Sequence, residues 1–587
     1  MKRTKLTIAL IVTLWICFVF VAALLIVQIT QKSNGIQGPQ GPTGAQGTQG
    51  EQGPAGERGS YWYSGNGQPT STNPTNAKDG DMYLDLETMD VYSYNGSAWA
   101  KLGTIKGDDG ERGTKWFRGT DAPTNSDQLA NAQEGDFYFM YFEDTSLLTG
   151  YVIYVHNGEE WQVVADMSTA RNLSQAEQYS VKGPIELAAL AQLVNQGESF
   201  QNITIMLTDD IDLDGAAWTP IGKNNNSSNT YSGTPFKGTF DGNNKTISNL
   251  SIYSSGYDLS GESESIKYYA GLFGKLQNAT VKNLTIKGAQ VGLAPQYESG
   301  TRNVAPQYTG ILAGRIETSE ISNVHLEECN IRVSQHGGIF AGEAWTGTVS
   351  YCSLTKCSIN GNTGAFVGGF SAQGYATYSN CTVDGCTIQG GMKTGGIVGQ
   401  SDEGNYNMTD VTVKNSTLML MNNYGAGMLI GLLNYGNQTF ENCVVENCSI
   451  REERSQNTKM YDVGGFVGRI IAKEGNVKTF KDCRVDGISF TNYVAVYDVG
   501  GFVGGQQDSA SNHFTIKFED CSVNNMTVTS GTDDITAVGV FVGKLNSVGA
   551  NVTVEFAEDG NTYGKCGDYA VVGDDTHNVV GQPRKDD

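Results

Sequence analysis

Apolar and polar residues alternate in short runs over the second half of the chain, and one glycine-bounded apolar motif returns nine times there. The motif is clearest in Gly464–Arg469, which reads GGFVGR, and its closing glycines recur about 26 to 40 residues apart. Such a period predicts a solenoid, in which each repeat buries its apolar face only against its neighbours. The other copies are Ala270–Lys275, Ile311–Arg315, Gly337–Glu343, Gly364–Gly369, Gly395–Gln400, Gly427–Leu433, Gly500–Gly505 and Gly539–Lys544.

A second phrase follows most copies of the motif, with apolar residues at its second and fourth positions as a strand requires. Its first position is Asn or Asp in seven of eight copies, which predicts a polar ladder at one turn of the stack. With glycine at the tight bends, we expect three short strands per repeat and a parallel β-helix over residues 201–556, followed by a tail over 557–587. The copies begin at Asn283, Asn323, Tyr351, Asn380, Asp410, Asn442, Asp482 and Asp520.

Cysteines occupy two positions of this phrase and alternate there with small or apolar residues. The interchange predicts buried packing thiols rather than a metal site, although bridges between adjacent coils are also open at the spacing of paired strands. The first set is Cys352, Cys381, Cys443, Cys483 and Cys521, and the second is Cys329, Cys357, Cys386 and Cys448.

A helix is predicted before the repeats, within residues 180–200. Pro184–Asn195 starts with a proline suited to the first helical turn and places apolar residues at helical spacing. Gly197 can adopt the left-handed conformation that ends a helix. We expect this helix to cap the open end of the solenoid.

The N-terminus has the pattern of a membrane anchor. Lys2, Arg3 and Lys5 precede Leu6–Val27, an uncharged segment long enough to span a bilayer as a helix. We therefore predict a cytoplasmic tip and transmembrane helix over residues 1–31, with an extracellular ectodomain. A cleaved signal peptide is the alternative, but its apolar core would be shorter.

Glycine stands at every third position from Gly35 to Gly59. Only glycine fits at the axis of a collagen triple helix, so residues 35–59 predict a collagen-like stalk and a homotrimer, with a monomeric spacer as the alternative. Residues 107–113 (GDDGERG) repeat the pattern as a short linker. The segment resembles the collagen-like parts of bacterial and phage fibre proteins.

Residues 60–106 and 114–168 form two related small β modules. Each carries a Gly-Asp-aromatic pattern, then Asn-Gly between alternating runs, and then a tryptophan. Asn-Gly predicts hairpins with a type I′ turn at Asn95 and Asn157. We expect the aromatics to pack the small cores, with sugar binding as the less favoured alternative.

The helix, the phrase beginning at Asp210 (DIDLDGAAWTPIG), the phrase GTFDGNNKTISNLSI and the GGFVG copies together resemble the GLUG-motif proteins of bacterial surfaces. The resemblance covers about Val181–Lys544. It implies a surface protein of the kind that includes adhesins and immunoglobulin-cleaving metallopeptidases.

Charge and motif content narrow the chemistry. A net charge of −23 disfavours nucleic acid and anionic lipid as partners. The sequence shows no HExxH, G-x-S-x-G or phosphate-loop motif, so we predict no catalytic residue, no cofactor and no metal. Asp210, Asp212 and Asp214 resemble the start of a calcium loop, but the closing glutamate is missing and a half-buried strand fits better.

The predicted function is that of a membrane-anchored extracellular fibre or adhesin whose β-helix binds a glycan or protein without catalysis. The alternatives are a carbohydrate-active β-helix enzyme, whose carboxylates no short motif would reveal, and a purely structural spacer. Ligand-binding residues are not identified, but the long Tyr- and Ser-rich corners at Tyr253–Tyr269 and Gly292–Tyr308 are the expected place to find them.

Overall fold

The chain was analysed as a computed structural model, and the structure divides it into two compact units, Met1–Ile105 and Lys106–Asp587. The predicted anchor (Leu6–Val27), stalk (35–59) and linker (107–113) lie outside the described residues. No helix among the described residues is long and apolar enough to cross a bilayer. The described ranges are 60–105, 114–123, 131–142, 146–170, 177–224, 231–253, 269–292, 308–333, 335–361, 365–421, 425–452, 461–492, 495–506, 513–532, 534–545, 552–557, 560–573 and 578–586.

The first unit holds one four-stranded sheet in the order β1-β2-β3-β4, in which β1 is parallel to β2 and the other pairs are antiparallel. Buried Asp81 fixes its start, because its carboxylate accepts hydrogen bonds from the backbone N–H groups of Tyr61 and Lys78. The strands are Trp62–Gly65, Met82–Asp85, Asp90–Tyr94 and Trp99–Thr104.

The second unit begins with the same arrangement, in the order β5-β6-β8-β9. Asp136 repeats the role of Asp81 by accepting from the N–H groups of Lys115 and Gln133. The duplicated sequence pattern therefore corresponds to a duplicated fold. These strands are Trp116–Gly119, Phe137–Tyr141, Tyr151–His156 and Trp161–Asp166.

The predicted type I′ turns are wrong. A type I′ turn needs positive φ at both central residues, but only Gly96 and Gly158 have it. The hairpins instead close through four-residue loops, since Tyr94 pairs with Trp99 and the Asn95 carbonyl oxygen Oδ1 accepts from the N–H groups of Ser97 and Ala98. The asparagine side chain competes for the backbone donors and widens the turn.

Helix α2 spans Pro184–Asn195, as predicted, and Gly197 has a φ of 121°. It connects β11 (Gln178–Val181) to β12 (Thr204–Leu207), which pair in parallel and start the large sheet. Leu187 and Leu190 of the helix are fully buried in the same apolar cluster as the first coils. The helix therefore closes this end of the core.

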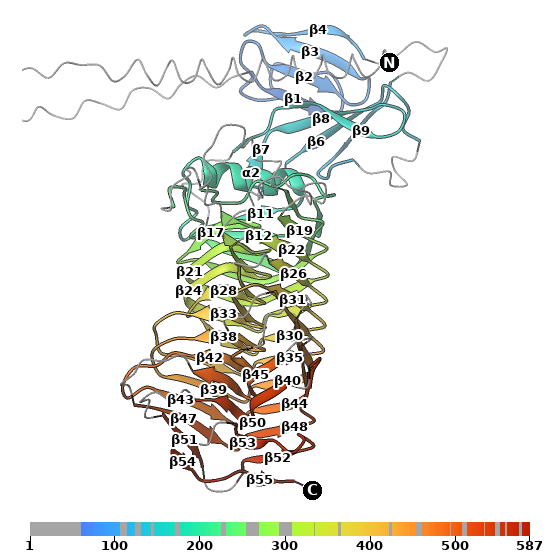
Figure 1. Ribbon diagram of the computed structural model, residues 1–587. Helices are drawn as coiled ribbons and strands as arrows, with labels where there is room; N and C mark the ends of the chain where they lie inside the picture. The colour runs from blue at the N-terminus through green and yellow to red at the C-terminus, as the bar shows by residue number, and fades with distance from the viewer. Residues whose placement is uncertain are drawn as a thin grey trace, which may run out of the picture. The chain divides into compact units, whose positions relative to one another are not determined.

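A continuous sheet of 45 strands follows, in which each strand pairs in parallel with its counterpart one coil later (Figure 1). One coil holds up to five short strands rather than the three expected, because left-handed single-residue bends interrupt it. An example is β27 (Phe366–Gly368), β28 (Ser371–Gly374), β29 (Thr377–Ser379), β30 (Thr382–Asp384) and β31 (Thr387–Gly390). Pairing continues beyond residue 556 through β52 (Thr562–Gly564) to β55 (Arg584–Lys585), so the predicted tail extends the solenoid.

The predicted Asn/Asp ladder is confirmed. All eight first positions, from Asn283 to Asp520, have φ between 51° and 55°. The side chains also connect coils, since Asn323 Nδ2 donates to Asn283 Oδ1 over 3.0 Å and Asn283 Nδ2 donates to Asp241 Oδ1 over 3.0 Å. Asparagine and aspartate tolerate this left-handed conformation, which explains their recurrence.

The described cysteines are all buried and free, which confirms the packing prediction. Each thiol makes weak hydrogen bonds to backbone carbonyls, as when Cys329 Sγ donates to Glu327 O at 3.3 Å and to Ile286 O of the preceding coil at 3.5 Å. Thiols can thus fill the narrow interior and also satisfy carbonyl groups at the bend.

Phe466 and Val467 of the glycine motif are fully buried, as expected. The first glycine is needed for close packing rather than for positive φ, because a Cβ on Gly500 would lie 2.0 Å from the Val503 carbonyl oxygen. One copy was misaligned in the sequence. Gly368 pairs with Gly338, so it is a first glycine, and Ala372 holds the closing position between Ser371 and Gln373.

Candidate ligand-binding site

The glycine motif brings two exterior positions together in each coil, the residue two places before its first glycine and the residue just after its closing position. These positions are seven apart in most coils and face each other. Thus His336 Nδ1 lies 3.5 Å from Glu343 Oε1, and Arg469 Nε donates to Asp462 Oδ2 at 2.7 Å. The backbone that packs the core therefore also creates a row of facing side chains outside.

In the early coils (residues 269–421) these positions form two columns in strict register, which we call the stripe. Strands β17 (Phe273–Gln277), β21 (Ala313–Glu327), β24 (Ala341–Ser350), β28 and β33 (Val398–Ser401) carry the second column and follow one another down the stack (Figure 1). The first column is Tyr269, Tyr308, His336, Phe366 and Lys393. The second is Lys275, Arg315, Glu343, Gln373 and Gln400.

Rings stack along the first column at the spacing of the coils. The ring centroids of Tyr269 and Tyr308 are 4.9 Å apart at an interplanar angle of 14°, and those of His336 and Phe366 are 4.9 Å apart at 26°. Lys393 Nζ closes the ladder 4.3 Å from the Phe366 centroid. Stacking and the cation–π contact hold these side chains in one row, in which Tyr269 is buried and the other four are partly exposed.

The second column begins with the cations Lys275 and Arg315, continues with Glu343 and ends with two neutral glutamines, while Glu317 lies beside it. Arg315 lies between two carboxylates, with Nη1 3.6 Å from Glu343 Oε2 and Nε 3.8 Å from Glu317 Oε2. Lys275 Nζ is 2.6 Å from Glu317 Oε2. Trp345 Nε1 donates to Glu343 Oε2 at 2.8 Å, and the guanidinium carbon lies 5.4 Å from the Trp345 ring centroid. Glu343 is only 3% exposed, so its charge depends on these partners.

The surroundings of the stripe shift the pKa values of Glu317 and Tyr308. Desolvation alone would raise the pKa of Glu317, but the hydrogen bond and charge of Lys275 and the charge of Arg315 outweigh it and hold that pKa below its ordinary value. Burial, helped by the Glu343 charge, raises the pKa of Tyr308 to about 12. Near neutral pH, Glu317 is ionised and Tyr308 is a neutral hydrogen-bond donor.

Two polar atoms of the stripe still lack a hydrogen bond. Within the residues that the structure describes, buried Arg315 Nε and His336 Nδ1 have none. Buried polar atoms are normally satisfied, and exceptions concentrate where a ligand or ordered water binds. The stripe is therefore prepared to accept a polar ligand.

The corners expected to recognise a ligand lie outside the described residues apart from their ends. The C-terminal ends of both corners belong to the stripe. The described chain resumes at Tyr269 after residues 254–268 and at Tyr308 after residues 293–307, and these two residues are the first two rings of the ladder. The motif itself was expected to be only scaffold, and the residues flanking it were missed. A signal was present, because aromatic and charged residues recur just before the motif and just after it.

The three aspartates of the possible calcium loop stabilise the first coil instead. Ile211 and Leu213 are buried between them, as expected for a half-buried strand. Asp210 Oδ1 accepts from the Thr246 N–H at 2.7 Å, and Asp212 Oδ1 accepts from Asn249 Nδ2 at 2.8 Å. Within the described ranges, no group of three or more His, Cys, Asp or Glu residues is placed to hold a metal ion.

A comparison of the chain with known protein families finds no match. A segment of 207 residues is 30% identical to halomucin from Haloquadratum walsbyi, which corresponds to 31% of this chain and 2% of halomucin. The solved structure of a candidate immunoglobulin A1 protease from Bacteroides ovatus is similar with a TM-score of 0.28 and 16% identity, over 63% of this chain and 84% of that one. The fold places the chain among mostly β proteins with a large parallel solenoid sheet.

Proposed function

We propose that this protein is a membrane-anchored extracellular fibre whose parallel β-helix binds a surface glycan along the stripe without cleaving it. The observation that carries the proposal is the stripe itself, where a ring ladder faces a charged column. Its groups repeat once per coil, at the roughly 4.8 Å spacing of paired strands, so a chain-like ligand of repeating polar units could contact several coils in turn.

The placement outside the cell rests on the N-terminal sequence and on similarity. Leu6–Val27 would be the anchor and residues 35–59 the collagen-like stalk. The similarity to halomucin over 207 residues supports a surface or extracellular location. Membership among the GLUG-motif proteins is part of the same proposal and rests on the phrases quoted above.

The charge states of the stripe favour binding over cleavage. A glycoside hydrolase needs a carboxylic acid with a raised pKa as proton donor, whereas the pKa of Glu317 is lowered. A lyase needs a base whose pKa lies near the working pH, and the pKa of Tyr308 is raised to about 12. Arg315 is equally unsuited as a base, because Glu343, Tyr269 and Glu317 outweigh desolvation and raise its pKa.

The test is a glycan array probed with the full chain in lipid nanodiscs, followed by affinity measurements with Arg315→Met/Glu343→Gln. This double change removes one charge of each sign. We expect at least a tenfold loss of affinity, since a hydrogen bond to a charged group contributes about 1.5–3 kcal/mol. The matched control is Lys473→Met/Glu403→Gln, an exposed ion pair that belongs to neither column of the stripe, which should bind as the wild type does.

Three outcomes would contradict the proposal. If no glycan binds, or if the stripe variant binds unchanged, then the stripe is not a glycan site. If the array sugars are shortened during incubation and the stripe variant abolishes this, then the enzyme alternative is correct. Binding of host proteins but not glycans would reassign the ligand class.

A further inference from the structure

The sheet of the first unit has apolar residues on both faces. Its inner face is covered, with Tyr83 and Tyr92 buried. By register, Trp62 lies beside Met82 on the other face, and Leu84 lies opposite Val91 there. Trp62 is 37% exposed, and Leu102, at the bulge of β4, is 63% exposed. A sheet with only one buried face would carry polar residues on the other.

The second small sheet repeats this outer face at the same positions. Trp116 pairs with Phe137, their rings stack at 4.7 Å, and Phe139 pairs with Ile153. Val164, at the equivalent bulge of β9, is 53% exposed. Only the leading tryptophan is common to the two faces, yet the equivalent positions are apolar in both modules. Two exposed apolar faces of matching design indicate an interaction surface.

The chain just before each sheet indicates the partner. The run of Gly-x-y triplets that ends at Gly59 stands three residues before Trp62, and the run that ends at Gly113 stands three residues before Trp116. A Gly-x-y run packs with two further chains of the same kind. Each sheet would therefore begin beside the same sheet of two other copies, held at high effective concentration.

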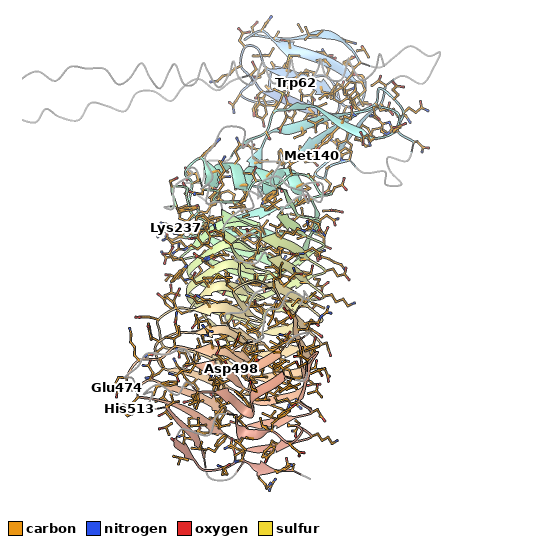
Figure 2. All side chains as sticks on the ribbon, viewed as in Figure 1. Trp62, Met140, Lys237, Glu474, Asp498 and His513 are labelled. Carbon is orange, nitrogen blue, oxygen red and sulfur yellow. The ribbon has the colours of Figure 1, made fainter. Side chains whose placement is uncertain are left out.

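We propose that the outer faces of the two small sheets are the contact surfaces of a homotrimer, in which each sheet packs against the same sheet of two further copies. The inference rests on the collagen-like segments in the proposed function but not on the ligand of the stripe. In this arrangement the small modules hold the three chains together on the C-terminal side of each Gly-x-y run. Figure 2 labels Trp62, the first residue of β1 on this face.

The test is chemical cross-linking of the full chain in intact membranes, compared with Leu102→Lys/Val164→Lys. Both side chains are exposed, so lysine can be placed there without disturbing either sheet, while three like charges would meet in the trimer. We expect a three-chain species for the wild type and its loss in the double variant. The matched control is Ser97→Lys/Glu159→Lys, at the exposed hairpin loops of the same modules, which should remain trimeric.

Each other result overturns the inference. If the face variant stays trimeric, the sheets are not the contact, even if the triplet runs alone assemble three chains. If the wild type is monomeric, there is no trimer to hold. Glycan affinity measured on the same samples separates this inference from the proposed function: the face variant should retain single-site binding and lose only the gain from multivalency.

Discussion

The early coils (residues 269–421) and the late coils (425–573) share one backbone plan but differ in one exterior column and one interior column. In the early coils Tyr269 stacks on Tyr308 in the exterior column, and His336 meets Tyr308 edge-on. In the late coils the same exterior positions hold Asp462 and Asp498, and the interior column becomes a stack of phenyl rings. Asp498 is labelled among the late coils in Figure 2.

A single interior column shows the change. The residues of this column pair in register from coil to coil. They are aliphatic and mixed side chains in the early coils and form an unbroken stack of phenyl rings in the late coils. Its members are Val281, Ile321, Val349, Tyr378, Met408, Phe440, Phe480, Phe518 and Phe556. The glycine motif thus fixes the backbone, while the side chains of these two columns differ between the early and the late coils.

Removing one ring from the late core should give the largest effect. Phe480→Ala deletes a fully buried ring stacked on Phe440 and Phe518, with centroids at 4.9 and 5.2 Å. We expect a loss of about 3–5 kcal/mol in the free energy of unfolding, measured by urea denaturation. Ile321→Val, in the same column of the early coils, should cost only about 0.5–1.5 kcal/mol. A loss for Phe480→Ala no larger than that for Ile321→Val would show that the phenyl stack adds little to the stability of the late coils.

The second prediction concerns the first glycine of the motif, which all coils share. A Cβ on Gly500 would lie 2.0 Å from the Val503 carbonyl oxygen and 2.7 Å from the Gly543 nitrogen, and both atoms belong to rigid backbone. Gly500→Ala should therefore cost about 1–3 kcal/mol, read from the urea midpoint. In Gly183→Ala the new Cβ meets no atom within 4 Å, so the control should change the midpoint much less. A neutral Gly500→Ala would mean that the coils can separate slightly.

The coil could be predicted because its rules are local. Left-handed bends call for Asn, Asp or Gly, and interior positions accept only small or apolar side chains, so period and interchange revealed both. The strand number failed because left-handed bends such as those at Asn380 and Gly385 divide the coil further, and the alignment at Gly364–Gly369 failed for a different reason. A motif rich in glycine can be aligned to itself in more than one register, and only pairing partners such as Gly338 and Gly368 decide between them.

The stripe was not predicted because it depends on contacts between coils. Arg315 and Glu343 are 28 residues apart in the sequence (343 − 315) and are neighbours only because adjacent strands pair in register. Aromatic and charged residues beside a glycine motif do not indicate a site until the strand register between coils shows which of them are neighbours. The predicted corners at Tyr253–Tyr269 and Gly292–Tyr308 came closest to identifying the site, because they end at two of its rings.

The third prediction compares a half-buried ion pair of the early coils with an exposed one that joins Glu403 of the early coils to Lys473 of the late coils. Arg315→Met leaves the nearly buried Glu343 without its cation and should cost about 1–3 kcal/mol. Adding Glu343→Gln should recover part of that loss, because the uncompensated charge is gone. Lys473→Met breaks the exposed pair with Glu403 and should change stability by less than about 0.5 kcal/mol. A double variant less stable than Arg315→Met would contradict this.

The smallest effect is a pH dependence that has the same sign in the two halves but falls in different pH windows. Early cations are held by carboxylates, whereas Lys478 in the late coils is fully buried and donates to the carbonyl oxygens of Asn434 at 2.8 Å and Gly436 at 2.7 Å. Burial lowers the pKa of Lys478 to about 7. The unfolded chain then binds more protons between that pKa and about 10.4, so this lysine makes stability rise with pH across that window.

Glu317 has the same sign in a more acidic window. Its folded pKa is lowered, so its stabilising contribution is complete above the unfolded value of about 4.3 and is lost as the pH falls through the folded pKa. The measurement is the urea midpoint between pH 7 and 10 for the wild type and Lys478→Met. We expect the wild type to gain about 1 kcal/mol more than the variant, since the carbonyl acceptors stabilise the ammonium and offset much of the desolvation. Parallel pH profiles for the wild type and the variant would contradict this, because they would show that the carbonyl acceptors compensate fully for the buried charge of Lys478. The stability of the late coils would then be as independent of the ionisation of their cation as that of the early coils is in the same pH range.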